Sequence, residues 1–370
     1  MAKVYGTIAL DVLDYWDGVT DNADTIFGYE GDDWIFGGGG DDVLQGGPGA
    51  DHLYGDSGHD TANYGDSPVG VFVNLVNGDA RNGTAEGDSF HSIENLFGSL
   101  FNDTLIGDYH ENVLSGSWGD DNLHGGGGAD ILDGGLGSDE ASYWDSPDGV
   151  MVSLLWDSAS GGDAEGDELN SIENLAGSNH DDSLFGDNGA NVLRGFGGDD
   201  VLLGFGGPDK LYGDSRASPS GNDSLNGGGG NDILYGGMGA DTLAGGADAD
   251  TFVFEHAEDS PGLNASGDID LANTDVILDF NWWQGDRIDV QQIDANKTID
   301  GNQDFSFIGE HNTVGGFTAP GQVAYFNYGG DTYLIFNTDT VYHTESNTDF
   351  EFAIKVAGVQ TPNAFWFDHL

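Results

Sequence analysis

Acidic side chains that recur every nine residues are the groups in this chain best suited to chemistry. A nonapeptide that starts with glycine, has Asp or Asn at position six and is apolar at position eight occurs 17 times. Carboxylates at regular intervals in polar turns are hard oxygen ligands, which favour Ca²⁺. Position six is Asn in two repeats, at Asn112 and Asn191, and it is Asp in 15: Asp33, Asp42, Asp51, Asp60, Asp103, Asp121, Asp130, Asp139, Asp182, Asp200, Asp209, Asp223, Asp232, Asp241 and Asp250.

Glycine supplies the backbone of the turns that present these carboxylates. The chain has 64 glycines and 8 prolines in 370 residues, and the glycines gather early in each repeat. Glycine permits positive φ and close backbone approach, and a tight turn around a cation requires both. The turn glycines that we expect beside the cation are Gly37, Gly39, Gly46, Gly125, Gly127, Gly227, Gly229 and Gly236.

The repeats fall into three runs, residues 28–63, 98–142 and 177–253. Two related stretches, residues 64–97 and 143–176, separate the runs and match one another at a shift of 79 residues, for example AEGDSFHSIEN against AEGDELNSIEN. A unit that is itself repeated has a structural role, so we expect the helical path to continue through both stretches.

Each separating stretch consists of two nonapeptides around a 16-residue excursion, at Val73–Asp88 and Val152–Asp167. In the first stretch we expect Val71 and Leu96 to occupy position eight. A five-residue insertion at Arg216–Ser220 interrupts one repeat of the third run, and we expect it to form a loop that projects outward.

The repeat resembles the RTX, or hemolysin-type, calcium-binding nonapeptide. The resemblance implies a parallel β-roll in which six residues turn, three form a short strand, and two nonapeptides complete one coil. Weaker nonapeptides start at Gly6 and Val19. The expected fold class is therefore all-β, with a parallel β-roll over residues 1–253 followed by a compact antiparallel β capping module over residues 254–370.

The same resemblance implies where the ions lie. Because successive repeats lie on opposite sides of the roll, an ion is expected between repeat n and repeat n+2. Asp33 would then share an ion with Asp51, and Asp42 with Asp60. Counting such pairs along the three runs gives about 11 calcium sites.

The charge of the chain restricts its partners and its stability. It has 8 Lys+Arg against 66 Asp+Glu, a formal net charge of −58, which excludes binding to nucleic acid or an anionic membrane surface. No apolar stretch is long enough to span a membrane, and without cysteine no disulfide can form. We therefore expect the chain to be largely disordered at cytosolic calcium and to fold outside the cell, where Ca²⁺ binding supplies folding energy.

The last 117 residues have a different pattern. Their alternating aromatic and β-branched residues predict strands over residues 276–280, 287–290, 305–308, 322–327, 332–337 and 350–356. Such a module would cover the open end of the roll, which repeat proteins need. The four acids Asp275, Asp279, Asp286 and Asp289 have two interpretations, a further calcium site or a solvated strand end.

This segment resembles the C-terminal domain of serralysin-type metalloproteases. The matching text includes GADADTFVFEHAEDSPG, TDVILDFNWWQGDRIDVQQID and FEFAIKVAGV. The resemblance implies a secretion module that a type I exporter reads at the extreme C-terminus. The chain ends in FWFDHL, and His369 departs from the acidic and aliphatic ending usual in that family.

Catalytic motifs are missing from the sequence. It contains neither His-Glu-x-x-His for zinc nor Gly-x-Ser-x-Gly for a nucleophilic serine. His52 and His124, at positions seven and nine, are expected to face solvent. The position-nine aromatic pairs Phe36 with Tyr54 and Tyr212 with Tyr235 should stack, either as surface packing or as a stripe that binds sugar or a partner.

The function that we expect is that of a secreted, extracellular, non-enzymatic calcium-binding protein that folds after type I export. It would serve as a structural, adhesive or matrix component, with cell-surface or matrix polysaccharide as a candidate partner. The alternative is a C-terminal part or accessory of a secreted hydrolase or polysaccharide-modifying enzyme.

Overall fold

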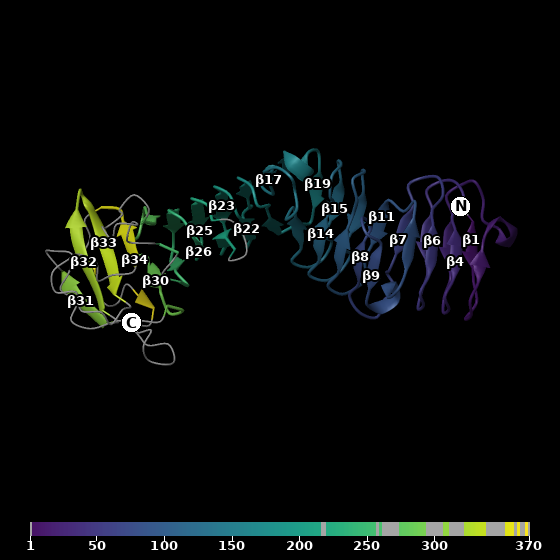
Figure 1. Cartoon of the computed structure of the whole chain (residues 1–370), viewed down its shortest axis with the longest axis horizontal. Coiled ribbons are helices and arrows are strands. Elements are labelled where there is room, and N and C mark those ends of the chain that lie inside the picture. Colours follow the sequence, from purple (N-terminus) through teal and green to yellow (C-terminus); the bar gives the residue numbers. More distant parts are fainter. Residues whose placement is uncertain are drawn as a thin grey trace. The chain divides into compact units, whose positions relative to one another are not determined.

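A computed structural model describes residues 2–215, 220–256, 259–260, 274–293, 306–310, 322–337, 352–358, 361–362 and 367–368. The chain divides into two compact units, Met1–Ala176 and Gly177–Leu370, each of which is described by itself. Apart from three short 3₁₀ helices, the regular structure of the described residues is β-strand, which confirms the expected all-β class (Figure 1). No helix in these ranges has the length and apolar character needed to cross a membrane.

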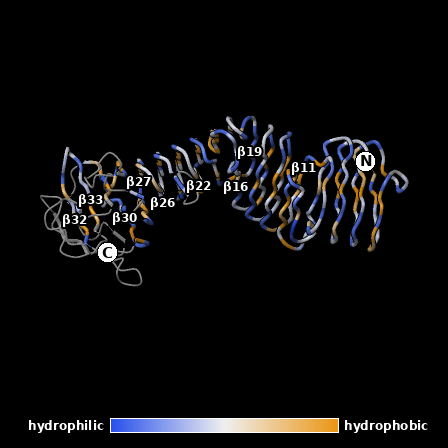
Figure 2. The backbone as a smooth tube through the Cα atoms, in the orientation of Figure 1, coloured by the Kyte–Doolittle hydropathy of each residue, from blue (hydrophilic) through white to orange (hydrophobic). Residues whose placement is uncertain are grey.

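The first unit is built almost entirely from three-residue strands. In most of them the middle residue is buried and its two neighbours are more exposed, so one apolar side chain per nonapeptide faces the core. Hydrophobic and hydrophilic residues alternate along the coils of this unit (Figure 2). The strands are β1 (Lys3–Tyr5), β2 (Val12–Leu13), β3 (Thr25–Phe27), β4 (Trp34–Phe36), β5 (Val43–Gln45), β6 (His52–Tyr54), β7 (Thr61–Asn63), β8 (Phe72–Asn74), β9 (Asp79–Arg81), β10 (Ser89–His91), β11 (Asn95–Phe97), β12 (Thr104–Ile106), β13 (Val113–Ser115), β14 (Asn122–His124), β15 (Ile131–Asp133), β16 (Glu140–Ser142), β17 (Met151–Ser153), β18 (Ser158–Ser160), β19 (Glu168–Asn170) and β20 (Asn174–Ala176), with 3₁₀ helices η1 (Tyr15–Asp17), η2 (Gly83–Ala85) and η3 (Gly162–Ala164).

Successive nonapeptides alternate between sheets. One sheet has the strand order β1-β3-β5-β7-β11-β13-β15-β19, a second has β10-β6-β4-β2, and a third contains β20-β16-β14-β12-β8-β9. Thr25 pairs with Val43 in parallel, and Trp34 pairs with His52, so each strand lies beside the one 18 residues away. This is the expected parallel β-roll, with two nonapeptides in each coil.

The first excursion ends one sheet and starts another. β10 is the last strand of the second sheet, whereas β8 and β9 form an antiparallel hairpin that starts the third sheet. Leu96 occupies position eight as expected, since it pairs with Leu114. The expectation for Val71 was wrong: Val73 pairs with Leu105 and is the central residue of β8, because the chain shifts by two residues as it enters the hairpin.

The second unit continues the same pattern and then changes. Its strands are β21 (Ser183–Phe185), β22 (Val192–Phe196), β23 (Val201–Gly206), β24 (Lys210–Asp214), β25 (Ser224–Gly229), β26 (Ile233–Tyr235), β27 (Thr242–Ala247), β28 (Thr251–Val253), β29 (Val276–Ile277), β30 (Arg287–Asp289), β31 (Ser306–Glu310), β32 (Gln322–Tyr328), β33 (Asp331–Asn337), β34 (Phe352–Val356) and β35 (Phe367–Asp368). One ladder contains β35-β30-β28-β26-β24-β22, and another contains β21-β23-β25-β27-β29-β34-β33-β32-β31.

Beyond residue 253 the parallel ladders continue through β29 and β30, which pair with β27 and β28. A strand lies in each of the six C-terminal segments where the sequence predicts one. β32, β33 and β34 pair antiparallel, while β31 pairs parallel with β32, so the C-terminal sheet is mixed. Most of the expected loop at Arg216–Ser220 and of the FWFDHL ending lies outside the described residues.

Candidate metal centres in the turns

The aspartates at position six are buried in the turns that precede the strands. All 15 have exposed fractions of 3% or less. The amide of each such residue donates a hydrogen bond to the carboxylate one coil further on. Examples are Asp33 N to Asp51 Oδ1 at 2.7 Å, and Asp223 N to Asp241 Oδ1 at 2.8 Å. The structure therefore brings together the pairs n and n+2 that the sequence predicts.

The second carboxylate oxygen of most of these residues has no hydrogen-bond partner. We call the turn of a repeat open when the Oδ2 atom of its position-six aspartate is buried and unpartnered. Among the described residues the open turns are those of Asp33, Asp42, Asp51, Asp60, Asp121, Asp130, Asp139, Asp200, Asp209, Asp223, Asp232, Asp241 and Asp250. A buried polar atom that lacks a partner is costly. Each of these oxygens is therefore suited to a cation.

The position-one glycine of an open turn lets two oxygens lie close to the turn backbone. A Cβ atom built on Gly37 would lie 2.6 Å from Asp42 Oδ2 and 2.8 Å from the carbonyl oxygen of Gly55 in the next coil, closer than a side chain can approach either oxygen. Both are oxygens of the kind that coordinate Ca²⁺, and only glycine allows them to lie this close to the turn. The donor set therefore fits Ca²⁺, which accepts carboxylate and carbonyl oxygens alike.

Position-three glycines have a different role. A Cβ on Gly127 would meet nothing closer than 3.7 Å, and one on Gly229 nothing closer than 3.9 Å. Position-two glycines carry the conformational requirement instead, since Gly38, Gly47 and Gly126 have φ values between 86° and 96°. Two of the predicted turn glycines, Gly127 and Gly229, therefore have room for a larger side chain at their own positions.

Burial of these carboxylates without a cation shifts their titration. Desolvation raises the pKa of Asp51 to about 7, although the bond from the Asp33 amide opposes this. For Asp223 the same cause raises the pKa to about 9, and neighbouring acids including Asp241 and Asp200 add to the effect. Dehydrated carboxylates close to one another need a positive charge, which a proton or a divalent ion can supply.

Four turns differ from the rest. In these closed turns, at the start of the second and third runs, the position-six side chain accepts the amide of its own position-two residue. Ser99 N donates to Asp103 Oδ2, and Ser178 N donates to Asp182 Oδ2, both at 2.5 Å. In these turns the backbone N–H of the position-two residue, and not a cation, is the partner of the side-chain oxygen at position six. Asp103 and Asp182 are thus placed less favourably for calcium, and both belong to repeats in which Phe101 or His180 replaces the fourth glycine.

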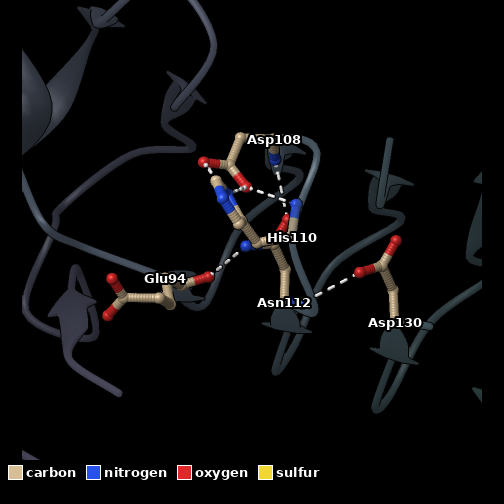
Figure 3. A network of polar contacts seen from close by, with 5 residues as sticks. All are labelled: Glu94, Asp108, His110, Asn112 and Asp130. Carbon is tan, nitrogen blue, oxygen red and sulfur yellow. Dashed lines mark hydrogen bonds and ion pairs between the residues drawn. The ribbon is translucent and has the colours of Figure 1, made fainter. Parts of the chain in front are cut away.

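Asn112 belongs to another closed turn (Figure 3). Its Oδ1 accepts the Asp108 amide at 2.7 Å, and its Nδ2 donates to the carbonyl oxygen of Glu94 at 2.6 Å. His110 donates its amide to Asp108 Oδ1 at 2.9 Å, and the Asn112 amide continues the chain to Asp130 Oδ1 at 2.8 Å. The side-chain amide of Asn112 thus supplies an N–H donor and no negative charge. Asn191 accepts the Asp187 amide in the same way at 2.8 Å.

No group of three or more His, Cys, Asp or Glu side chains able to hold a metal is found among the described residues. A site in this roll therefore combines one or two carboxylates with backbone carbonyls. That division suits calcium, which takes six to eight oxygens, better than a metal that needs several imidazole or thiolate ligands.

Sequence reasoning missed the acids that close each run. The Asp51 and Asp60 amides donate to Asp88 Oδ1 and Glu94 Oε2, at 2.8 and 2.9 Å. Asp130 and Asp139 make the equivalent bonds to Asp167 and Glu173. These four acids do not occupy position six of a nonapeptide. They lie at corresponding places in the two stretches that match at a shift of 79 residues, and this match is the signal that points to them.

The four C-terminal acids do not form one cluster. Asp275 precedes β29, is fully buried, accepts the Asp241 amide at 2.8 Å and has an unpartnered Oδ2. Asp286 precedes β30 in the other ladder and accepts the Asp250 amide at 3.2 Å. Both are buried and continue the position-six pattern, so the interpretation as a solvated strand end is wrong for Asp275 and Asp286. Asp279 instead accepts the amides of Gly245 and Gly246.

Two expectations about outward side chains have different outcomes. The aromatic pairs do stack, with ring centroids 4.7 Å apart for Phe36 and Tyr54 and 4.5 Å apart for Tyr212 and Tyr235. The expectation that His124 faces solvent was wrong. It is 3% exposed because its Nε2 lies 2.8 Å from Asp145 Oδ1.

A family model of the RTX calcium-binding nonapeptide repeat matches residues 20–53, 27–62, 92–123, 106–141, 176–211 and 220–252. No curated protein matches the chain.

Solved structures that are similar to the chain include the following two. The solution structure of the AlgE6R3 subunit from the Azotobacter vinelandii mannuronan C5-epimerase shares 28% identity, covers 48% of this chain and 70% of that chain, and has a TM-score of 0.22. The crystal structure of extracellular lipase LipA from Serratia marcescens shares 17% identity, covers 77% of this chain and 41% of that chain, and has a TM-score of 0.20. The residues that the family model matches are RTX calcium-binding nonapeptide repeats.

Proposed function

We propose that this chain is a secreted, non-enzymatic protein whose roll folds when Ca²⁺ fills its open turns, and that it serves as an extracellular structural, adhesive or matrix component. The observation that carries the proposal is the row of buried, unpartnered Oδ2 atoms, each beside a glycine whose missing side chain lets that oxygen lie close to the turn backbone. RTX nonapeptide repeats bind calcium. The proposal adds that binding and folding are one process in this chain.

The calcium ligands in this proposal are the open-turn aspartates together with turn carbonyls such as that of Gly55. When bound, calcium supplies the positive charge that these oxygens lack, and it draws successive coils together. Each coil buries only one central side chain from each of its two strands, for example Leu44 and Leu53. With a net charge of −58, the apolar core is too small to hold the coils without cations.

Secretion is the second part of the proposal. A chain that remains unfolded at cytosolic calcium suits a type I exporter, which the resemblance of the C-terminal segment to serralysin-type domains implies. Extracellular calcium then completes folding, because loading of weak sites depends directly on the free ion concentration. Cell-surface or matrix polysaccharide is the partner that we propose for the adhesive role.

Circular dichroism in the far ultraviolet tests the central claim. The full chain should give a weak, disordered spectrum in a chelator and a β spectrum in millimolar calcium, with magnesium as the control ion. A β spectrum that the chelator leaves unchanged would refute calcium-dependent folding. Export is tested separately, by deleting the last residues in a host that carries a type I exporter and measuring the secreted fraction.

The enzyme alternative is tested by activity. The described part of the first unit contains a groove of about 900 Å³ whose lining includes His59, Tyr109 and His110, and this groove is one candidate place for an active site. Assays of the calcium-loaded chain for lipase, protease, lyase and epimerase activity should all be negative. Any turnover that His110→Ala abolishes would favour the enzyme.

A further inference from the structure

The last turn of the first run meets a partner that is not a nonapeptide. Asp60 is fully buried, and its Oδ2 has no hydrogen-bond partner. Its amide donates to Glu94 Oε2 at 2.9 Å, just as the Asp42 amide donates to Asp60 Oδ1 at 2.7 Å. Glu94 therefore has the place that the next position-six aspartate has within a run.

A backbone carbonyl completes the correspondence. The heavy atoms nearest to a Cβ built on Gly55 are the carbonyl oxygen of Ser92 and Asp60 Oδ2. In the preceding turn of the same sheet, that of Gly37, the corresponding atoms are the carbonyl oxygen of Gly55 and Asp42 Oδ2. Ser92 thus stands in for a position-one glycine. It does so with a φ of 52°, a left-handed conformation that serine rarely adopts.

The arrangement occurs a second time, 79 residues later. Asp139 is buried with an unpartnered Oδ2, and its amide donates to Glu173 Oε2 at 2.9 Å. The carbonyl oxygen of Ser171 and Asp139 Oδ2 are among the atoms nearest to a Cβ built on Gly134, and Ser171 has a φ of 51°. Two copies with the same strained serine argue for a function that requires this backbone.

We propose that these two junctions are calcium sites outside the nonapeptide pairing, one formed by Asp60, the Ser92 carbonyl and Glu94, the other by Asp139, the Ser171 carbonyl and Glu173. The inference rests on the proposed calcium function and goes beyond its pairs of nonapeptides. The longer side chain of glutamate lets a segment that does not follow the repeat supply the carboxylate. Each ion fastens the return of an excursion, at β11 or β20, to the run before it.

A second paired substitution provides a matched control. Glu86 and Glu165 are also related by 79 residues, and their Oε2 atoms accept the amides of Asn82 and Gly161 at 2.8 and 2.9 Å. Both are exposed. Asn82 and Gly161, which donate these amides, have no carboxylate that could bind an ion. Changing Glu86 and Glu165 to glutamine therefore removes the same charge from the same stretches without touching the proposed sites.

The experiment is calorimetric titration of the full chain with Ca²⁺. The double variant Glu94→Gln, Glu173→Gln should bind two fewer ions than the wild-type chain, while Glu86→Gln, Glu165→Gln should bind the wild-type number. At saturating calcium, amide hydrogen exchange of the first double variant should be at least about tenfold faster at residues 60–61 and 139–140, with the other coils still protected.

The outcomes separate this inference from the proposed function. If the wild-type chain binds no calcium, the proposed function fails with it. An unchanged ion count and affinity in Glu94→Gln, Glu173→Gln overturns only the junction sites. If that double variant loses most of its ions, Glu94→Gln and Glu173→Gln are measured one at a time. Loss of one ion from each single variant supports the inference. Loss of all ions from either single variant assigns that glutamate a purely structural role and overturns the inference.

Discussion

The amide of Asp33 donates a 2.7 Å hydrogen bond to Oδ1 of Asp51, which lies 18 residues later and one coil further along the roll. Asp51 makes the equivalent bond to Asp88. The Asp51 carboxylate thus orients the turn before it through Oδ1, while its Oδ2 stays buried and unpartnered. Damage to one open turn therefore affects the neighbouring turns on the same side.

Asp42→Asn tests this coupling. Asparagine keeps an oxygen for the Asp24 amide but removes the charge that attracts calcium. We expect the free energy of unfolding in calcium to fall by about 1–3 kcal/mol, the scale for a buried group that loses a charged partner. Calcium-dependent thermal denaturation measures the change.

The matched control is Asp41→Asn, which removes the same charge from the exposed adjacent position. It keeps an oxygen for the His59 amide, which now donates to Asp41 Oδ1 at 3.0 Å. A change of less than about 0.5 kcal/mol is expected there. Equal losses in both variants would show that total charge, rather than the turn site, determines stability.

Gly37→Ala tests the space beside the carboxylate. Its Cβ would lie 2.6 Å from Asp42 Oδ2 and 2.8 Å from the Gly55 carbonyl oxygen, so the turn must open or lose its ion. We expect a destabilisation of about 1–3 kcal/mol, typical of overpacking, and weaker calcium binding. Gly127→Ala, where the nearest atom is 3.7 Å away, should leave both quantities near wild type. If alanine at Gly37 leaves stability and calcium binding unchanged, the close approach of Asp42 Oδ2 and the Gly55 carbonyl oxygen to this turn is not needed for the site.

Protons and calcium should compete for the open turns. Burial raises the pKa of Asp51 to about 7 and that of Asp200 to about 8 in the cation-free roll, above the usual value near 3.8. The folded state then binds more protons than the unfolded state, so stability without calcium is greatest below about pH 4 and is lost as the pH rises through 7 to 8. In calcium the trend reverses, because the ion binds the deprotonated carboxylates.

Two measurements check this sign. The calcium-free chain should show more β structure at pH 4 than at pH 8 by circular dichroism. Calorimetric titration with calcium at pH 6 should release protons, seen as a heat that depends on the ionisation enthalpy of the buffer. A heat that is independent of buffer would mean that the sites are already deprotonated before calcium binds, which is the result expected if the calcium-free chain is unfolded at pH 6 or if burial does not raise their pKa values.

Tyr64→Phe tests a metal-free contact within the first separating stretch, residues 64–97. Tyr64 is fully buried, and its hydroxyl donates to Asp88 Oδ2 at 3.1 Å, so this oxygen has a partner without a cation. Removal of the hydroxyl leaves a buried carboxylate oxygen unpaired, which costs about 1–3 kcal/mol. Tyr143→Phe, which removes the equivalent 3.0 Å bond to Asp167, should cost the same amount in chemical denaturation. A cost confined to one of the pair would show that the two excursions are not equivalent.

The sequence predicts the repeating part of the molecule well, because a nine-residue period fixes both the strand centre and the turn. Leu44 and Leu234 are buried at position eight, as the pattern requires. The residue types separate open turns from closed ones only in part. Phe101 and His180 replace the fourth glycine in two closed turns, and Asn112 and Asn191 lack the position-six carboxylate in the other two, but Asp248 replaces the same glycine in the open turn of Asp250. That difference depends on whether the position-two amide points toward the aspartate, as Ser99 does toward Asp103, and a backbone direction is not visible in residue types.

The excursions were harder to predict for a different reason. Val71 and Val73 are both apolar and both buried, so their hydrophobicity does not show which one is the central residue of the strand. The pairing of Val73 with Leu105 depends on the antiparallel hairpin of β8 and β9, which no nonapeptide encodes. The role of Glu94 could not be predicted from the repeat, because it depends on contact with Asp60, 34 residues earlier.

The change of sheet at the first excursion has a mechanical consequence. The second sheet stops at β10, and β8 and β9 begin the third, so tension along the chain meets a break in one ladder while the other runs on through β7, β11 and β13. Under a stretching force we expect the coils before residue 64 and those after residue 97 to rupture as separate blocks. A protein that spans a gap outside the cell would thereby yield in steps and absorb work at each one.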